Sequence, residues 1–292
     1  WMAGCFYWTG FDYHGEPTPH RWPTVSSFFG IMDLCGFPKM AYYLHQAQWV
    51  KDKPVLELVP HWNWPADSIG KPIKVMALIN ADKVKLLLNG KEISEQQVDP
   101  YEMNTWSVPY KPGKLEAIGY KNGKIVSRTK VETTKEPVQV RLIPDRNSLA
   151  GDGRDAMPVT VEVVDSKGRH VPTANNMIEF TVTGPAEIIG VGNGDPNCHE
   201  PEKGNKRSLF YGLAQVIIQS KEGAGTITLT ATTPGLKPAT ITIDANQVAP
   251  VPFIAAEFPP MLLNKWVASP LSTEKPDATR QIADNDMNSW QP

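Results

Sequence analysis

The stretch TITLTAT at residues 226–232 strongly constrains what this chain can fold into. Threonine and apolar residues alternate there without a break, and successive side chains of a β-strand point to opposite faces. One face of the strand therefore carries Ile227, Leu229 and Ala231, and the other carries threonine. A sheet with one apolar face buries that face against a second sheet, so the pattern predicts a β-sandwich.

Similar short runs occur on both sides of this stretch, in VQVRLIP, VTVEVVDSKGRHV, MIEFTVTG, AQVIIQS and ATITIDA. The sequence Lys135-Glu136-Pro137 precedes the first of them and marks a plausible boundary. We therefore expect residues 136–247 to form one immunoglobulin-like β-sandwich.

Residues 51–135 show the same period of two in IKVMALIN, KVKLLLNGKEI, NTWSVPY and KLEAIGYKNGKIVS. Asn89-Gly90 and Asn122-Gly123 lie within two of these runs, and Asn-Gly is the strongest short hairpin signal. Val84, Leu86 and Leu88 share one strand face. These features predict a second, smaller immunoglobulin-like sandwich at 51–135.

Residues 1–50 differ from the rest of the chain. Ala3 to Phe11 is a nearly continuous apolar run, which predicts a strand buried on both faces, as in parallel sheets. The run KMAYYLHQAQWV follows Pro38, lacks glycine and proline, and predicts a helix from Lys39 to Val50. One such β/α unit cannot fold alone, so we expect another polypeptide segment to pack on residues 1–50.

The charge and composition of the chain limit the kinds of partner that it can bind. The formal charge is −2, with 29 Lys+Arg against 31 Asp+Glu, and no charge run predicts binding to nucleic acid or to a membrane surface. There is no apolar run of about 18 residues and no signal-peptide pattern, and the first residue is Trp1, so we expect a fragment of a longer protein. Residues 248–292 begin proline-rich and predict a linker and the start of a further, truncated domain.

The opening stretch WMAGCFYWTGFDYHGEPTP contains the candidate catalytic and substrate-binding residues. Asp12 and Glu16 resemble the acid/base pair of a glycosidase, whose carboxyl groups lie about 5 to 9.5 Å apart. Four extended residues span roughly 13 Å, so these acids favour positioning roles over catalysis. Trp8, with carboxylates and His14 nearby, is typical of a pyranose site, in which an indole stacks on the sugar and acids accept hydroxyl protons. A core role for Trp8 is the alternative.

Other motifs favour structural roles. His61, Trp62 and Trp64 in PHWNWP could form a sugar platform, but two tryptophans at alternate positions more often pack one face against a neighbour, here the domain to which residues 1–50 belong. The stretch 192–195, GNGD, lacks the pattern of a phosphate loop or a calcium loop and predicts a tight turn. Three cysteines at wide spacing, Cys5, Cys35 and Cys198, indicate neither a disulfide framework nor a zinc site.

Several motifs, in order, resemble glycoside hydrolase family 2 enzymes of the β-galactosidase type from multidomain polysaccharide-degrading bacteria. WTGFDYHGEPTP, SSFFGIMDLCGFPKMAYYLHQAQW and PHWNWP resemble the last strand and helix of the catalytic (β/α)8 barrel. NADKVKLLLNGK and WSVPYKPGKLEAIGYKNGK resemble the immunoglobulin-like domain that follows. VTVEVVDSKGRHVPTANNMIEFTVTG, GVGNGDP and FYGLAQVIIQS resemble the next β domain. The resemblance extends to about residue 247.

The resemblance implies a mainly β chain that lacks both catalytic glutamates, which end earlier barrel strands, so no catalytic residue is expected here. It implies that Trp8 forms a wall of the sugar subsite, that Glu16 binds sugar hydroxyls, and that Asp12, a weaker candidate for a substrate contact, anchors the loop. The parent would hydrolyse terminal β-galactosides with retention, without metal or organic cofactor, in the periplasm or at the cell surface. The fragment alone would be inactive.

Two alternatives stay open. An extracellular array of immunoglobulin-like spacer or adhesion modules fits the strands after residue 54 equally well, but has no use for the β/α unit at 1–50. Within the enzyme class, a β-glucuronidase or β-mannosidase fits as well as a β-galactosidase, because the residues that select the sugar lie mainly upstream.

Overall fold

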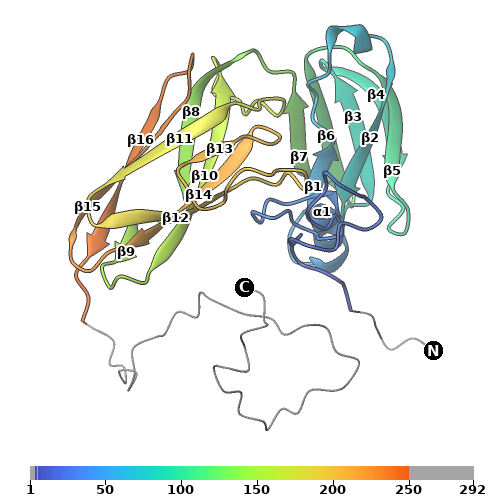
Figure 1. Cartoon of the computed structure of the whole chain (residues 1–292). Coiled ribbons are helices and arrows are strands. Elements are labelled where there is room, and N and C mark those ends of the chain that lie inside the picture. Colours follow the sequence, from blue (N-terminus) through green and yellow to red (C-terminus); the bar gives the residue numbers. More distant parts are fainter. Residues whose placement is uncertain (1–3, 5, 250–292) are drawn as a thin grey trace, which may run out of the picture. The chain divides into compact units, whose positions relative to one another are not determined.

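A computed structural model of the chain describes Gly4 and residues 6–249. These residues are mainly β, as predicted, and their strands form four sheets (Figure 1). The buried apolar side chains form two separate cores, one between residues 58 and 117 and the other between residues 140 and 245. No helix in this part of the chain is both long and apolar enough to cross a membrane.

The first sandwich comprises seven strands: β1 (Leu56–Val59), β2 (Pro72–Ile79), β3 (Lys83–Leu88), β4 (Lys91–Gln97), β5 (Asn104–Pro109), β6 (Lys114–Lys121) and β7 (Lys124–Glu132). One sheet has the order β1-β2-β5 and the other the order β4-β3-β6-β7. A short 3-10 helix, η1 (Ala66–Ser68), precedes β2. Every strand pair in these two sheets is antiparallel.

Both predicted Asn-Gly hairpins are confirmed. Asn89 and Gly90 join β3 to β4 with φ values of 53° and 81°, and Asn122 and Gly123 join β6 to β7 with φ values of 50° and 73°. Two consecutive positive φ angles are what the tightest hairpin turns require. The predicted apolar face of β3 is also confirmed, because Val84 and Leu86 are fully buried.

The second sandwich comprises nine strands: β8 (Pro137–Pro144), β9 (Ser148–Ala150), β10 (Ala156–Asp165), β11 (Met177–Thr183), β12 (Ala186–Gly192), β13 (Lys206–Ser208), β14 (Leu213–Ser220), β15 (Gly225–Thr232) and β16 (Ala239–Asn246). Its sheets have the orders β12-β14-β10-β8 and β13-β11-β15-β16-β9. The β9–β16 pair is parallel. The alternation in β15 is confirmed, because Ile227, Leu229 and Ala231 are fully buried while the threonines between them face outward.

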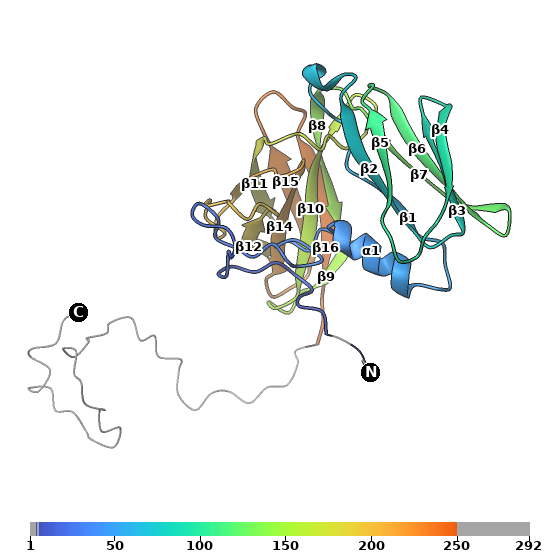
Figure 2. The same cartoon turned by 90° about the vertical axis from the view of Figure 1, so that its right-hand side faces the viewer.

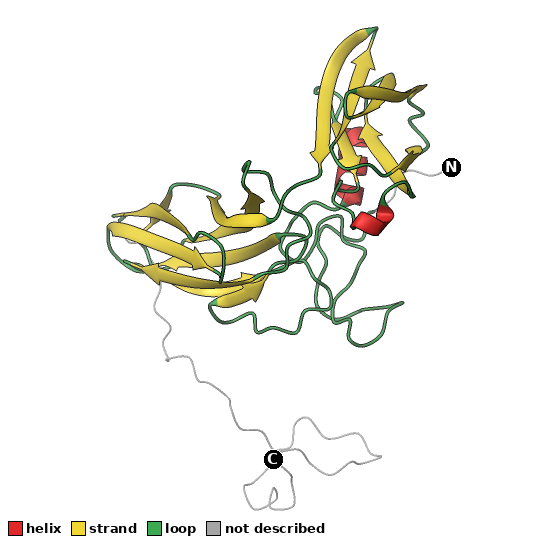
Figure 3. Ribbon diagram, turned by 90° about the horizontal axis from the view of Figure 1, so that it is seen from above, coloured by secondary structure: helices red, strands yellow, loops and turns green. Residues whose placement is uncertain are grey.

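The N-terminal part agrees only partly with the sequence prediction. Helix α1 (Met40–Trp49) is confirmed and lies against β1 and β2. The strand predicted from Ala3 to Phe11 is wrong where the structure describes it, because residues 6–11 form a loop with one isolated bridge, Phe11 to Met32 (Figure 3). A strand buried on both faces needs parallel strands on both sides, and the described residues supply only the single parallel bridge to Met32. Phe6 is accordingly fully exposed. A barrel unit is therefore not seen. The interpretation of 248–292 falls almost wholly outside the described residues.

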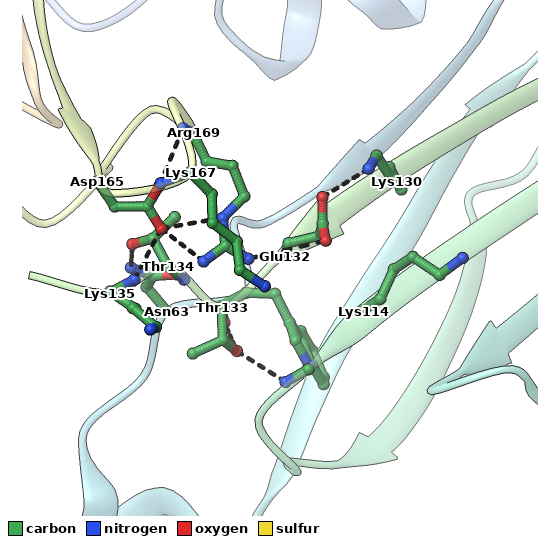
Figure 4. Close-up of polar contacts among 12 residues, drawn as sticks. Asn63, Lys114, Lys130, Glu132, Thr133, Thr134, Lys135, Asp165, Lys167 and Arg169 are labelled. Atoms are coloured by element: carbon green, nitrogen blue, oxygen red, sulfur yellow. Dashed lines mark hydrogen bonds and ion pairs between the residues drawn. The ribbon is translucent and has the colours of Figure 1, made fainter.

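A buried carboxylate clamps the connection between β7 and β8 (Figure 4). The side chain of Asp165 is 0% exposed. It accepts hydrogen bonds from the backbone N–H groups of Lys135 at 3.0 Å and Lys167 at 2.8 Å, and from Arg169 Nε at 2.9 Å. Arg169 also lies 3.7 Å from Glu132, at the end of β7. Burial alone would raise the pKa of Asp165, but these donors outweigh it and hold the pKa well below its usual range.

Replacing this carboxylate should destabilise the second sandwich. We expect Asp165→Asn to lower the free energy of unfolding by about 3 kcal/mol, because Arg169 loses its buried counter-charge. Urea denaturation followed by far-ultraviolet circular dichroism measures this, because residues 136–247 contain no tryptophan whose fluorescence could report on the second sandwich. Asp145→Asn is the matched control, because Asp145 is 65% exposed and lies 3.8 Å from Arg146, and it should cost less than about 0.5 kcal/mol.

The same carboxylate predicts a specific acid sensitivity. The folded-state pKa of Asp165 is depressed, so its contribution is fully present above the unfolded pKa of about 3.9 and is lost as the pH falls below that value. Between about pH 5 and about pH 3, the unfolding free energy of the wild type should fall more steeply than that of Asp165→Asn. Parallel slopes in urea titrations across this range would contradict the assignment.

Candidate functional site

Two stretches of loop hold the candidate site. The N–H of Ile31 donates to the carbonyl of Thr9 at 3.1 Å, that of Met32 to Gly10 at 3.0 Å, and that of Asp12 to Met32 at 3.0 Å. Gly30 lies where these stretches approach most closely, since a Cβ there would be 2.2 Å from the Asp12 nitrogen. The backbone of residues 9–12 is therefore fixed by residues 30–32.

Asp12 faces the interior of this loop pair. It is 8% exposed, and its carboxylate accepts hydrogen bonds from the Gly30 N–H and from Lys39 Nζ, both at 2.8 Å. Lys39 Nζ also donates to the Phe28 carbonyl at 2.7 Å. The Asp12 carboxylate thus joins Gly30 and Lys39, and Lys39 extends the contact to Phe28, as the loop-anchor interpretation predicts. A direct sugar contact by Asp12 stays a prediction.

Trp8 and Glu16 come together through Tyr13. Trp8 Nε1 donates to the Tyr13 hydroxyl at 3.2 Å, and the two rings meet edge to face with centroids 6.4 Å apart. The Tyr13 hydroxyl in turn donates a short hydrogen bond to the Glu16 carboxylate. Gly15 and Glu16 both have positive φ values, 87° and 40°, so the chain turns sharply there and directs Glu16 back to Tyr13. The Trp8–Thr9 peptide bond is cis.

This trio of Trp8, Tyr13 and Glu16 presents an apolar ring and an anionic acceptor on one surface. Trp8 is 71% exposed, which argues against an ordinary core tryptophan in the described chain. The Glu16 carboxylate raises the pKa of the Tyr13 phenol, because ionisation would break the hydrogen bond and place two negative charges side by side. The trio can stack against an apolar ring face and accept protons from hydroxyl groups.

Tyr13 is the site residue that sequence reasoning missed. A tyrosine between Asp12 and His14 was visible in the sequence, but its contacts with Trp8 and Glu16 depend on the turn at Gly15. His14, also noted near the site, does not bond to Trp8 or Glu16; instead its Nε2 is 2.6 Å from Glu202 Oε1.

The remaining motifs have structural positions. Trp62 is fully buried, donates to the Lys111 carbonyl at 3.0 Å and packs edge to face on Tyr110. Trp64 packs against the same core of the first sandwich, so the packing interpretation is confirmed, with the sandwich and not a barrel as the neighbour. Burial lowers the pKa of His61, with His170 adding to the effect.

The GNGD stretch is a turn, as predicted. The side chain of Asn193 accepts a hydrogen bond from the Asp195 N–H at 3.1 Å, and that of Asp195 accepts one from the Asn197 N–H at 2.8 Å. Cys35 and Cys198 form no disulfide. No group of three or more histidine, cysteine or acidic residues in Gly4 and 6–249 is arranged to hold a metal ion.

Comparisons with known proteins agree with this architecture. A family model described as glycoside hydrolase family 2 C-terminal domain 5 matches residues 140–242, and a domain of unknown function (DUF4982) matches residues 70–127. The chain is 45% identical to "Beta-galactosidase BoGH2A" of Bacteroides ovatus, over 85% of this chain and 29% of that protein. It is 35% identical to a putative β-glucuronidase of Formosa agariphila, over 75% of this chain and 22% of that protein.

Solved structures of glycosidases are also similar to most of this chain. A β-glycosidase from Bacteroides vulgatus matches with a TM-score of 0.78 and 35% identity, over 82% of this chain and 30% of that one. A glycosyl hydrolase family 2 member from Bacteroides cellulosilyticus matches with a TM-score of 0.77 and 30% identity, over 82% and 36% of the two chains. The chain thus spans about a third or less of the length of these relatives.

The hydrogen bond between Tyr13 and Glu16 makes a spectroscopic prediction. In Glu16→Gln, Tyr13 should ionise at a lower pH than in the wild type, because the carboxylate that raises its pKa is gone. Carbon-13 NMR of labelled tyrosine measures the titration. The phenol of Tyr43, whose pKa is raised mainly by burial, is the internal control and should not change. An unchanged Tyr13 titration would contradict the contact.

Proposed function

Because the chain belongs to glycoside hydrolase family 2, we propose that it is the C-terminal portion of a retaining exo-β-glycosidase, with terminal β-galactosides as the substrate. Retaining enzymes use one carboxylate as nucleophile and a second as acid/base, through a covalent glycosyl-enzyme. In this proposal both are glutamates of an N-terminal catalytic segment outside residues 1–292. The mechanism requires no metal or organic cofactor.

The trio of Trp8, Tyr13 and Glu16 carries the proposal. An exposed indole fits the C–H face of a galactopyranose, and Glu16 accepts hydrogen bonds from its hydroxyl groups. Tyr13 holds both side chains in register, so the site loses little side-chain entropy when the sugar binds. These residues would form one wall of the pocket.

The proposed domain organisation follows the sequence prediction. Residues 1–50 would complete the catalytic barrel, 51–135 and 136–247 would be immunoglobulin-like, and 248–292 would be a linker with the start of another domain. Phe6 and Phe11 support this proposal, because their exposed aromatic side chains need a partner such as the N-terminal catalytic segment. A periplasmic or cell-surface location is part of the proposal by family analogy.

The galactoside has two rivals as the substrate, a β-glucuronide and a β-mannoside. The name of the Bacteroides ovatus relative supports a galactoside, whereas the Formosa agariphila relative is named a putative β-glucuronidase. Nitrophenyl β-galactoside, β-glucuronide and β-mannoside, assayed side by side with the full-length enzyme, separate these candidates. The highest kcat/KM for the galactoside is the expected result, and the highest value for the glucuronide would reassign the substrate.

The site residues are tested in the full-length enzyme. Trp8→Ala should lower kcat/KM for nitrophenyl β-galactoside about 30-fold, because truncating a buried aromatic anchor in a complex costs about 2 kcal/mol. Glu16→Gln should lower it about tenfold or more, as expected for a hydrogen bond to a charged acceptor. Tyr101→Ala is the control, because Tyr101 is a 93% exposed aromatic residue on the first sandwich and should have no effect.

Two results would overturn the proposal. One is wild-type kinetics in both Trp8→Ala and Glu16→Gln, which would remove these residues from the sugar site. The other is hydrolysis of the galactoside at the parent's rate by purified residues 1–292, since the catalytic glutamates are assigned elsewhere. Full-length protein without any glycosidase activity would favour the alternative of spacer or adhesion modules.

A further inference from the structure

The second sandwich contacts the loop that carries the trio, although the two are far apart in sequence (Figure 2). The N–H of Val25 donates to the Pro196 carbonyl at 2.9 Å, and Gln215 Nε2 donates to the Cys35 carbonyl at 3.1 Å. The contact between His14 and Glu202 adds little strength, because both side chains are more than half exposed. A cleft of about 460 Å³ borders these contacts beside Tyr13.

The tightest contact lies at the GNGD turn. A Cβ at Gly194 would be 1.8 Å from Asp33 Oδ2, and a Cβ at Gly192 would be 2.8 Å from Cys35 Sγ. Neither glycine has a left-handed φ, so glycine is needed there for space and not for backbone conformation. The turn after β12 and residues 33–35 are therefore in direct contact with no room for a side chain between them.

Asp33 cannot easily move away from this contact. Its Oδ1 accepts hydrogen bonds from the N–H groups of Cys35 and Phe37, both at 2.9 Å, and its own N–H donates to the Phe37 carbonyl at 3.0 Å. Residues 33–37 thus form a turn that is closed by its own hydrogen bonds. A push on the Asp33 carboxylate would shift the turn as a unit.

Such a shift would reach the trio. The N–H of Met32, the residue before Asp33, donates to the Gly10 carbonyl, and the Met32 carbonyl accepts from the Asp12 N–H. The N–H of Ile31 donates to the Thr9 carbonyl. Trp8 is adjacent to Thr9 and Tyr13 is adjacent to Asp12. The backbone that presents the trio therefore takes its position from residues 31–33, of which Asp33 contacts Gly194.

We propose that the second sandwich positions the sugar-binding loop of the enzyme, with Gly194 as the positioning residue that acts through Asp33. This inference rests on the proposed function, and it gives the second sandwich a role in substrate binding. The interaction with the sugar ring is made in the ground state and in the transition state alike, so a displaced loop would raise KM more than it lowers kcat.

Gly194→Ala in the full-length enzyme tests the proposal. We expect KM for nitrophenyl β-galactoside to rise about fivefold with kcat within about twofold of the wild type. Hydrogen exchange of peptides covering 9–16 should become faster, since their bonds to 30–32 are disturbed. Gly190→Ala is the matched control on the same β12 strand, because its Cβ would meet only the Glu202 carbonyl, at 3.9 Å, and the Ile217 side chain, at 4.0 Å. It should match the wild type in both measurements.

A second variant keeps the test decisive if Gly194→Ala fails to fold. Gly192→Ala should raise KM less, and the double variant Gly192→Ala/Cys35→Ala should restore it, because removing the sulfur makes room for the new methyl group. Unchanged exchange of 9–16 in Gly194→Ala, or failure of the double variant to restore KM, would overturn the inference. A wild-type enzyme without glycosidase activity would instead overturn the proposed function, and the exchange measurement would still report on the contact.

Discussion

The burial of one face of each strand is the constraint on which the rest of this structure depends. Residues such as Leu86 in the first sandwich and Leu229 in the second are fully buried because a facing sheet covers them. Each sandwich encloses its own core, and the two cores share no member. The segments outside the sandwiches therefore gain little from apolar burial, and polar contacts hold them in place.

Two buried carboxylates make the most important of these contacts. Asp165 fixes the connection between the sandwiches through Lys135 and Arg169, and Asp12 fixes the site loop through Gly30 and Lys39. A buried carboxylate is costly unless donors satisfy it, and each of these accepts hydrogen bonds from at least one backbone N–H group and from a cationic side chain. The same arrangement thus appears once at a domain connection and once beside the candidate site.

The strand predicted from Ala3 to Phe11 does not form in the described residues. An apolar run such as Ala3 to Phe11 indicates a strand that needs neighbouring strands on both sides, but it does not identify the segment that provides them. Within the described residues no strand pairs with residues 6–11, and the aromatic side chains of Phe6 and Trp8 are exposed. In the proposed full-length enzyme the catalytic segment supplies the missing neighbouring strands. It would cover Phe6 and Phe11, and Trp8 would contact the sugar.

The sequence by itself determined most of the strands, though not β1, β9, β12 or β13, and it determined the Asn89-Gly90 and Asn122-Gly123 hairpins, helix α1 and the mainly β class. These features follow from local periodicity and from turn residues. It also drew attention to Trp8, Asp12 and Glu16. Only the tertiary structure decided that Asp12 points inward to Lys39, and that Tyr13 joins Trp8 to Glu16. It alone brought Gly194 against Asp33, 161 residues earlier in the chain (194 − 33). Contacts of this kind depend on how loops fold in space, and no local pattern of residues encodes them.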